Sequence, residues 1–203
     1  MRFSTLFFDL DDTLYPAESG LWLVIKERIS IYMHEKLGLS WQEIPTLCQW
    51  LYQSYGTNMR GLKALYNIDE SDYLAFVHDI PLQHYLTPAP ELRRVIHELP
   101  QRKFVFTNSD SNHANRVLKT LGLDGCFEKI IDILMVSPYC KPMPESFQIA
   151  LREAGVEDPK QCVLIDDSVQ NLSEARNRGF FTIHLGRDEA PGAYQVNVGS
   201  ILE

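Results

Sequence analysis

The sequence has few cysteines, a shortage of basic residues and no long apolar run. Its four cysteines, Cys48, Cys126, Cys140 and Cys162, are scattered along 203 residues without a C-x-x-C pair. This spacing predicts neither a zinc site nor a disulfide framework, and it favours a reducing compartment such as the cytoplasm. No stretch approaches the roughly 18 apolar residues of a membrane span, and the first residues reach a charge too early for a signal peptide.

The charge balance is acidic. Nineteen Lys and Arg residues stand against 27 Asp and Glu residues, which gives a net charge of −8. Such a chain lacks the broad basic surface that nucleic acids or anionic membranes require, so we expect neither as a partner. With 45% hydrophobic and 23% charged residues, the composition is that of a soluble globular protein, and the length suits one domain with a small insertion.

Short apolar runs alternate with helical patterns along most of the chain. Runs at 3–8, 104–106, 162–165 and 181–185 predict strands buried on both faces. Between them, apolar residues recur at helical spacing, and these segments end at Pro100, Gly122, Gly155 and Gly179. The alternation predicts an α/β fold with a parallel sheet and right-handed crossovers.

Residues 21–86 interrupt this alternation with four amphipathic helical patterns. We therefore expect an α/β core formed by 1–20 and 87–203, with 21–86 as a helical insertion after the first strand. The insertion is either an accessory bundle or a cap over an active site. The cap is favoured, because the chain is interrupted just after its most acidic strand end.

Polar residues gather where the predicted strands end. The first strand leads into Asp9, Asp11 and Asp12, and later strand ends contribute Thr107, Asn108, Ser109, Asp110, Asp166 and Asp167, with Lys141 on a loop between them. Ligands of open parallel sheets bind beyond the carboxyl ends of the strands. We therefore expect these side chains to form one site.

The chemistry of this set favours a divalent cation and a phosphate. Several carboxylates at one edge of a sheet repel one another, and a hard cation such as Mg²⁺ relieves that repulsion through oxygen ligands. Thr107, Asn108 and Lys141 supply the donors and the positive charge that phosphoryl oxygens require. One carboxylate is then available as a nucleophile and another as an acid and base.

Residues 9–14, Asp-Leu-Asp-Asp-Thr-Leu, resemble the D-x-D-x-[TV] motif of the haloacid dehalogenase superfamily, and of its phosphatase branch in particular. Thr107, Lys141 and the Asp166–Asp167 pair follow in the superfamily's motif order. The resemblance runs from about residue 7 to 186. It implies a Rossmann-like three-layer core with a helical cap inserted after the first strand.

The resemblance also implies a role for each matching residue. Asp9 would attack phosphorus and form an aspartyl-phosphate. Asp11 would protonate the leaving oxygen and then activate the hydrolytic water. Thr107 and Asn108 would hold the phosphoryl group, and Lys141 would neutralise its charge and orient Asp9.

The same resemblance implies a Mg²⁺ site. Its ligands would be Asp9, the backbone carbonyl of Asp11, and Asp167, with Asp166 nearby and acting through water. Which of Asp166 and Asp167 touches the metal directly stays open, and Asp167 is favoured.

A narrower resemblance concerns the substrate. Residues 7–16, 55–62, 106–110 and 166–171 resemble the pyrimidine 5′-nucleotidase-like subgroup. This implies a small phosphate ester as substrate, with a nucleoside 5′-monophosphate, and a pyrimidine one in particular, favoured. Sugar phosphates and phosphoglycolate are alternatives. Asp11 disfavours dehalogenation, because a halide needs no proton donor, whereas a mutase stays open.

Two other classes of protein compete with this reading. One is a receiver-type regulatory domain, which the acidic motif on the first strand disfavours. The other is an inactive relative that binds a protein.

Several residues have simpler interpretations. We expect Asp12 in a turn, Asp110 as a helix cap, the six histidines outside any metal site, and Trp22, Trp41 and Trp50 in a hydrophobic core. Asn171 either supports the site or braces its loop. Tyr15, Tyr55 and Arg60 are weaker candidates for substrate contacts.

Overall fold

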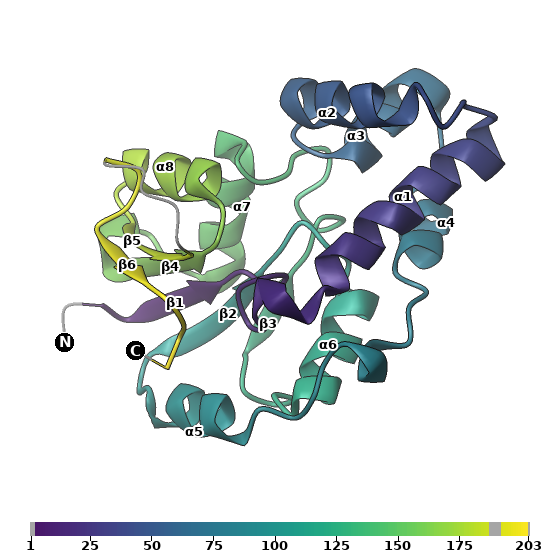
Figure 1. The fold of residues 1–203 in the computed structure, drawn as a ribbon. Helices are drawn as coiled ribbons and strands as arrows, with labels where there is room; N and C mark the ends of the chain where they lie inside the picture. The colour runs from purple at the N-terminus through teal and green to yellow at the C-terminus, as the bar shows by residue number, and fades with distance from the viewer. Residues whose placement is uncertain (1–2, 187–191, 203) are drawn as a thin grey trace. The chain divides into compact units, whose positions relative to one another are not determined.

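The computed structural model describes residues 3–186 and 192–202 and divides the chain into two compact units. Unit 1 comprises Met1–Ser19 with Leu86–Glu203, and unit 2 comprises Gly20–Tyr85. Figure 1 follows the chain from β1 through the helices of unit 2 and back to the sheet.

A parallel sheet forms the centre of unit 1. Six strands pair among the described residues: β1 (Thr5–Phe8), β2 (Arg102–Phe106), β3 (Lys129–Ile131), β4 (Cys162–Asp166), β5 (Phe181–Leu185) and β6 (Val196–Val198). Their order is β3-β2-β1-β4-β5-β6, and every pair is parallel. The α/β class with a Rossmann-like core is therefore confirmed.

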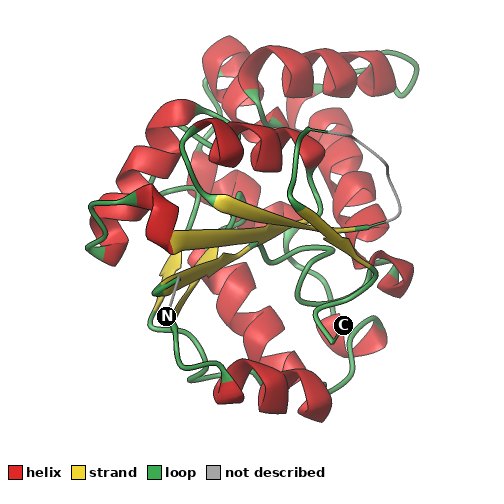
Figure 2. Cartoon of the chain, turned by 90° about the vertical axis from the view of Figure 1, so that its left-hand side faces the viewer, coloured by secondary structure: helices red, strands yellow, loops and turns green. Residues whose placement is uncertain are grey.

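Helices cover both faces of this sheet (Figure 2). Unit 1 contains α5 (Pro90–Glu98), α6 (Ser111–Leu121), α7 (Pro144–Ala154) and α8 (Val169–Asn177), with short 3₁₀ turns at Ala17–Ser19 and Pro159–Gln161. Helices α7 and α8 lie on one side of the sheet, and α5 and α6 lie on the other (Figure 1). Gly122 and Gly155 end α6 and α7 in left-handed conformations, as their places in the sequence predict.

Aromatic side chains fill the layer between the sheet and α7 and α8. Phe7 on β1 stands beside Phe104 on β2, with ring centroids 5.5 Å apart. Phe147 of α7 packs edge-on against Phe106 at 5.4 Å and against Phe180 at 6.0 Å. All five rings are almost fully buried, so they anchor α7 to the strands that carry the polar strand ends.

Unit 2 consists of four helices and one 3₁₀ turn. These are α1 (Leu21–Leu37), α2 (Ile44–Tyr55), α3 (Asn58–Tyr66), α4 (Glu70–Val77) and the turn Leu82–His84. Tyr32 of α1 packs edge-on against Tyr73 and Phe76 of α4. A Cβ atom at Gly61 of α3 would lie 2.4 Å from Leu51 Cδ2, so this glycine permits the close approach of α2 and α3.

The prediction of a core position is wrong for Trp41 and Trp50, which are 53% and 45% exposed. The buried residues of α2 are Ile44 and Leu51, one helical face that does not include Trp50. Trp41 precedes α2 and stacks on the ring of His34. Trp22 is partly buried.

The sequence patterns missed β3 and β6. Each has only three residues, and an apolar run that short cannot be distinguished from a loop by its periodicity. Both strands are defined by their pairing with a neighbouring strand: β3 pairs with β2, and β6 pairs with β5.

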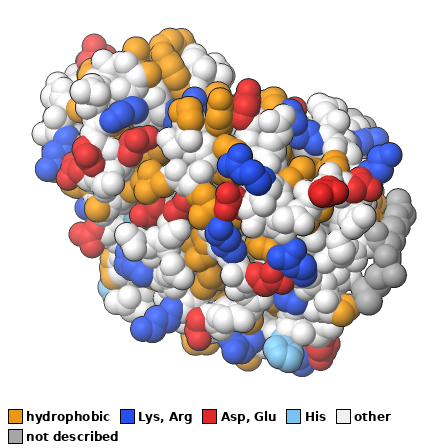
Figure 3. Space-filling view, turned by 180° about the vertical axis from the view of Figure 1, so that it is seen from behind, with side chains coloured by type: hydrophobic (Ala, Val, Ile, Leu, Met, Phe, Trp, Pro, Cys, Tyr) orange, Lys and Arg blue, Asp and Glu red, His pale blue; other side chains and the backbone are white. Residues whose placement is uncertain are grey.

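The surface carries charges of both signs. On the face in Figure 3, acidic and basic side chains are interspersed. Within the described residues, no helix is both long enough and apolar enough to cross a membrane.

Replacing Phe147 with Ala should lower the free energy of unfolding by about 3–5 kcal/mol, because the cavity would open between α7 and the sheet. Urea unfolding measures this loss. Gln148→Ala, at an exposed position of the same helix, is the control and should change little. Equal effects of the two substitutions would contradict the packing described here.

Candidate active site

The strand order places a site between β1 and β4. The chain builds β2 and β3 on one side of β1 and β4 to β6 on the other, so the order reverses at this point. Open α/β sheets bind ligands beyond the carboxyl ends of the strands at such a reversal. Asp9 follows β1, Asp166 ends β4, and Asp167 follows it.

Lys141 lies between two of these carboxylates. Its Nζ donates to Asp9 Oδ1 and to Asp166 Oδ2, each at 2.7 Å. The lysine side chain is 1% exposed, and that of Asp166 is fully buried. The loop before α7 thus supplies the ammonium group that joins the ends of β1 and β4.

One ammonium does not balance three carboxylates. Burial raises the pKa of Asp9 well above its ordinary value, and repulsion from Asp166 and Asp167 adds to this, against the opposing effect of Lys141. Burial, with repulsion from Asp166, raises the pKa of Asp167 to about 7. The two neighbouring carboxylates raise the pKa of Lys141 despite its burial, so it stays charged.

The donor set fits a divalent cation. Asp9, Asp166 and Asp167 each present an oxygen, and these oxygens lie within 4.8 Å of one another. When all three carboxylates are ionised, they and the one ammonium leave two negative charges, which one divalent cation would balance. Oxygen ligands of this kind suit Mg²⁺.

Hydrogen bonds hold Lys141 and Asp166 in place. Asn108 Nδ2 donates to the carbonyl oxygen of Lys141, and the Lys141 N–H donates back to Asn108 Oδ1, both at 2.9 Å. Asn171 Nδ2 donates to both oxygens of Asp166, and the Ser168 N–H donates to Oδ1. Asn171 therefore contacts the candidate site through Asp166, in agreement with the supporting role that the sequence analysis considered.

A buried histidine supports Asp167 from β5. His184 Nε2 donates to the carbonyl oxygen of Asp167 at 2.9 Å, and its ring stacks on Tyr194 with centroids 4.8 Å apart. No sequence pattern indicated this contact, because it depends on the pairing of β4 with β5.

Thr107 occupies the end of β2, beside the other polar residues of that loop. It is 1% exposed, and its Oγ1 accepts a hydrogen bond from the Ser109 N–H at 2.9 Å. The structure thus brings Thr107 and Asn108 to the same sheet edge as Asp9 and Lys141.

Asp11 belongs to a second group of side chains. Its carboxylate accepts hydrogen bonds from Tyr15, Ser109 and His113. Burial would raise the pKa of Asp11, but His113 and these hydrogen bonds outweigh burial and lower it below its ordinary value. The carboxylate is therefore ionised at neutral pH.

The remaining predicted residues have clear positions. Asp12 lies in a turn with a φ of 57°, and Asp110 caps α6 by accepting from the His113 N–H, as predicted. Tyr15, a candidate substrate contact, donates a hydrogen bond from its hydroxyl to the Asp11 carboxylate. Tyr55 and Arg60 lie in unit 2, where Arg60 donates to the carbonyl oxygen of Tyr55.

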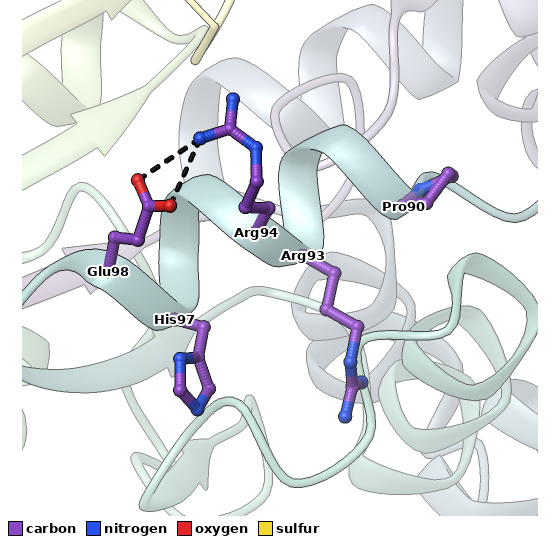
Figure 4. A pocket seen from close by; sticks show the side chains of 5 residues that line it. All are labelled: Pro90, Arg93, Arg94, His97 and Glu98. Atoms are coloured by element: carbon purple, nitrogen blue, oxygen red, sulfur yellow. Dashed lines mark hydrogen bonds and ion pairs between the residues drawn. The ribbon is translucent and has the colours of Figure 1, made fainter.

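A surface hollow on α5 is separate from this site. It is lined by Pro90, Arg93, Arg94, His97 and Glu98 (Figure 4). Arg94 pairs with Glu98, and Arg93 donates to the carbonyl oxygens of Gly122 and Asp124. None of its lining residues belongs to the carboxylate groups described above.

Comparison with protein families agrees with this geometry. Residues 3–179 match the family described as haloacid dehalogenase-like hydrolase. The chain belongs to this family. The predicted membership of the haloacid dehalogenase superfamily is therefore confirmed.

Individual relatives extend the comparison. Phosphate metabolism protein 8 of Saccharomyces cerevisiae is 33% identical over 197 residues, covering 90% of this chain and 61% of the yeast protein. CbbY of Rhodobacter sphaeroides, solved with phosphate, has 20% identity and a TM-score of 0.71, covering 99% of this chain and 96% of CbbY. The HAD-hydrolase YfnB of Bacillus subtilis, solved with magnesium, has 17% identity and a TM-score of 0.67, covering 98% and 96%.

Replacing Lys141 with Met should lower the free energy of unfolding by about 3–5 kcal/mol in the presence of a chelator, because it leaves buried carboxylates without their counter-charge. Urea unfolding at neutral pH measures this effect. Lys129→Met is the matched control, because Lys129 pairs with Glu153 at the surface and such pairs contribute little. A loss no larger than that of the control would contradict the role of Lys141.

Proposed function

We propose that the chain is a Mg²⁺-dependent phosphomonoester hydrolase that acts through an aspartyl-phosphate. The observation that carries this proposal is the buried Lys141 ammonium between Asp9 and Asp166, with Asp167 beside them. This arrangement combines a candidate nucleophile, the ammonium group of Lys141 and a set of oxygens suited to a metal ion at one sheet edge. Membership of a hydrolase family supports the same class of reaction.

Asp9 is the nucleophile in this proposal. One of its carboxylate oxygens forms a bond to phosphorus while the bond from phosphorus to the ester oxygen breaks. Lys141, Thr107 and Asn108 hold the phosphoryl oxygens and orient them for attack in line with the leaving group. The chain's own donors thereby perform the positioning on which phosphoryl transfer depends.

Asp11 transfers protons in both halves of the reaction. It donates a proton to the departing ester oxygen, and its ionised form then accepts a proton from the water that attacks phosphorus. The bond from Asp9 to phosphorus breaks in this second step, which restores the Asp9 carboxylate. The first step needs the protonated form of Asp11, and the negative charge of a bound phosphate favours that form because it opposes the donors that lower the pKa of this carboxyl.

Asp9, Asp167 and the backbone carbonyl of Asp11 would hold Mg²⁺, with Asp166 acting through water. When bound, the cation supplies positive charge that balances the carboxylates and the phosphoryl group. Lys141 and Asn171 would hold Asp166 beside the cation through their hydrogen bonds to its carboxylate.

We propose nucleoside 5′-monophosphates, and pyrimidine ones in particular, as substrates. The support is the resemblance of residues 7–16, 55–62, 106–110 and 166–171 to the pyrimidine 5′-nucleotidase-like subgroup. In this proposal unit 2 acts as a cap that selects the substrate. Only residues 16–19 separate Tyr15, which contacts Asp11, from the start of unit 2.

Asp9→Asn should abolish turnover and leave the fold intact, because the amide keeps the shape of the carboxylate and removes its nucleophilic oxygen. Phosphate release measures turnover, and thermal unfolding checks the fold. Asp12→Asn is the matched control, because it changes a neighbouring carboxylate in a turn that asparagine also tolerates. Turnover by Asp9→Asn at the control's rate, with deamidation excluded by mass spectrometry, would disprove the mechanism.

The substrate proposal predicts faster phosphate release from UMP and CMP than from AMP, GMP, sugar phosphates, phosphoglycolate or an aryl phosphate. Release should require Mg²⁺ and fall to background with excess chelator. Preference for a sugar phosphate or phosphoglycolate would keep the mechanism and discard the nucleotide. A protein that releases phosphate from none of these compounds would refute the proposed activity.

A further inference from the structure

The carboxylate of Asp11 is held by three donors from three segments of unit 1. Tyr15 OH donates to Oδ1 at 2.6 Å, and Ser109 Oγ donates to Oδ2 at 2.5 Å. His113 Nε2 lies 3.0 Å from Oδ1. An ionised carboxylate only accepts hydrogen bonds, so His113 donates from Nε2 and its proton is placed on that nitrogen.

His113 is a fully buried donor at the capped start of α6. Its side chain is fully buried, whereas that of Asp11 is 13% exposed. It lies in the first turn of α6, and its backbone N–H is bound by the capping Asp110 side chain at 3.0 Å. A hydroxyl group can rotate its hydrogen toward another acceptor, but a buried imidazole on a capped helix keeps its N–H direction.

We infer that His113 is a positioning residue for the Asp11 carboxylate. It directs this carboxylate toward the ester oxygen, which receives a proton, and toward the hydrolytic water, which gives one up. This inference rests on the proposed function, in which Asp11 is the acid and base. It assigns a role to a histidine outside the motifs that the sequence analysis identified. His113 acts through Asp11 and needs no contact with the substrate.

Such a role has a chemical signature in the leaving group. An alkoxide is a poor leaving group and needs the proton from Asp11, whereas a nitrophenolate departs without one. The ratio kcat/KM reports the steps up to formation of the aspartyl-phosphate, and therefore the departure of the ester oxygen. A misplaced Asp11 should lower kcat/KM for an alkyl phosphate far more than for a nitrophenyl phosphate. A general loss of folded protein lowers both equally.

Two isosteric substitutions separate the hydrogen bond from the packing. The amide nitrogen of glutamine can reach the position of the imidazole Nε2, whereas that of asparagine reaches only the position of Nδ1. His113→Asn should lower kcat/KM for UMP by about 10-fold or more. The same variant should keep kcat/KM for p-nitrophenyl phosphate within about threefold of wild type. His113→Gln should restore most of the lost activity toward UMP.

Two further variants separate the loss of a hydrogen bond to Asp11 from a loss of stability. Ser111→Ala removes the hydroxyl that donates to Asp132 at the start of the same helix, so it weakens α6 without touching Asp11. It should leave the ratio of the two kcat/KM values unchanged. Tyr15→Phe removes only the hydroxyl on Asp11 Oδ1 and should lower the UMP value selectively. Where the His113 variants do not fold, it tests the premise of the inference, that the donors to Asp11 direct its carboxylate.

Asp11→Asn distinguishes failure of this inference from failure of the proposed function. Selective loss of UMP hydrolysis in Asp11→Asn, with an unchanged ratio in His113→Asn, would overturn the inference alone. Equal losses for both substrates in Asp11→Asn would overturn the acid role of Asp11 and the inference with it. Selective loss in all three variants, with recovery in His113→Gln, is the expected result.

Discussion

The ion pair of Lys141 with Asp9 and Asp166 is the interaction on which the site depends. It brings an ammonium group and two carboxylates together out of water, which is costly unless each charge is matched and hydrogen-bonded. The ammonium of Lys141 balances part of the negative charge of Asp9 and Asp166, and Asn171 donates further hydrogen bonds to Asp166. The charge that stays unbalanced, increased by Asp167, is the physical reason why we propose a divalent cation at this site.

The fold supports this interaction through neighbouring strands and short loops. β1 and β4 pair directly, so the strand ends that carry Asp9 and Asp166 are adjacent. The aromatic layer around Phe7, Phe106 and Phe147 packs β1 and β2 against α7, which follows the loop of Lys141. Hydrophobic packing beneath the sheet edge therefore keeps the polar groups at fixed separations above it.

The sequence predicted the class of fold and most residues of the candidate site, but not the two histidines that contact Asp11 and Asp167. Alternating apolar runs and helical patterns indicated the parallel sheet, and the polar residues at the strand ends indicated Asp9, Thr107 and Asp166. Periodicity cannot identify three-residue strands, so β3 and β6 were missed. His113 and His184 were missed because an isolated histidine carries no pattern, and its partner is known only once the chain is folded.

The sequence by itself determined which chemical groups are available and that most of them follow a strand, since strand ends follow from hydrophobic patterning along the chain. Only the tertiary structure decided which of these groups meet. Lys141 is separated from Asp9 by 132 positions and from Asp166 by 25, yet its ammonium contacts both. Asp11 and His113 are likewise 102 positions apart. Strand order and helix packing set these contacts, because charges and hydrogen bonds act over a few ångströms in space, whatever the separation in sequence.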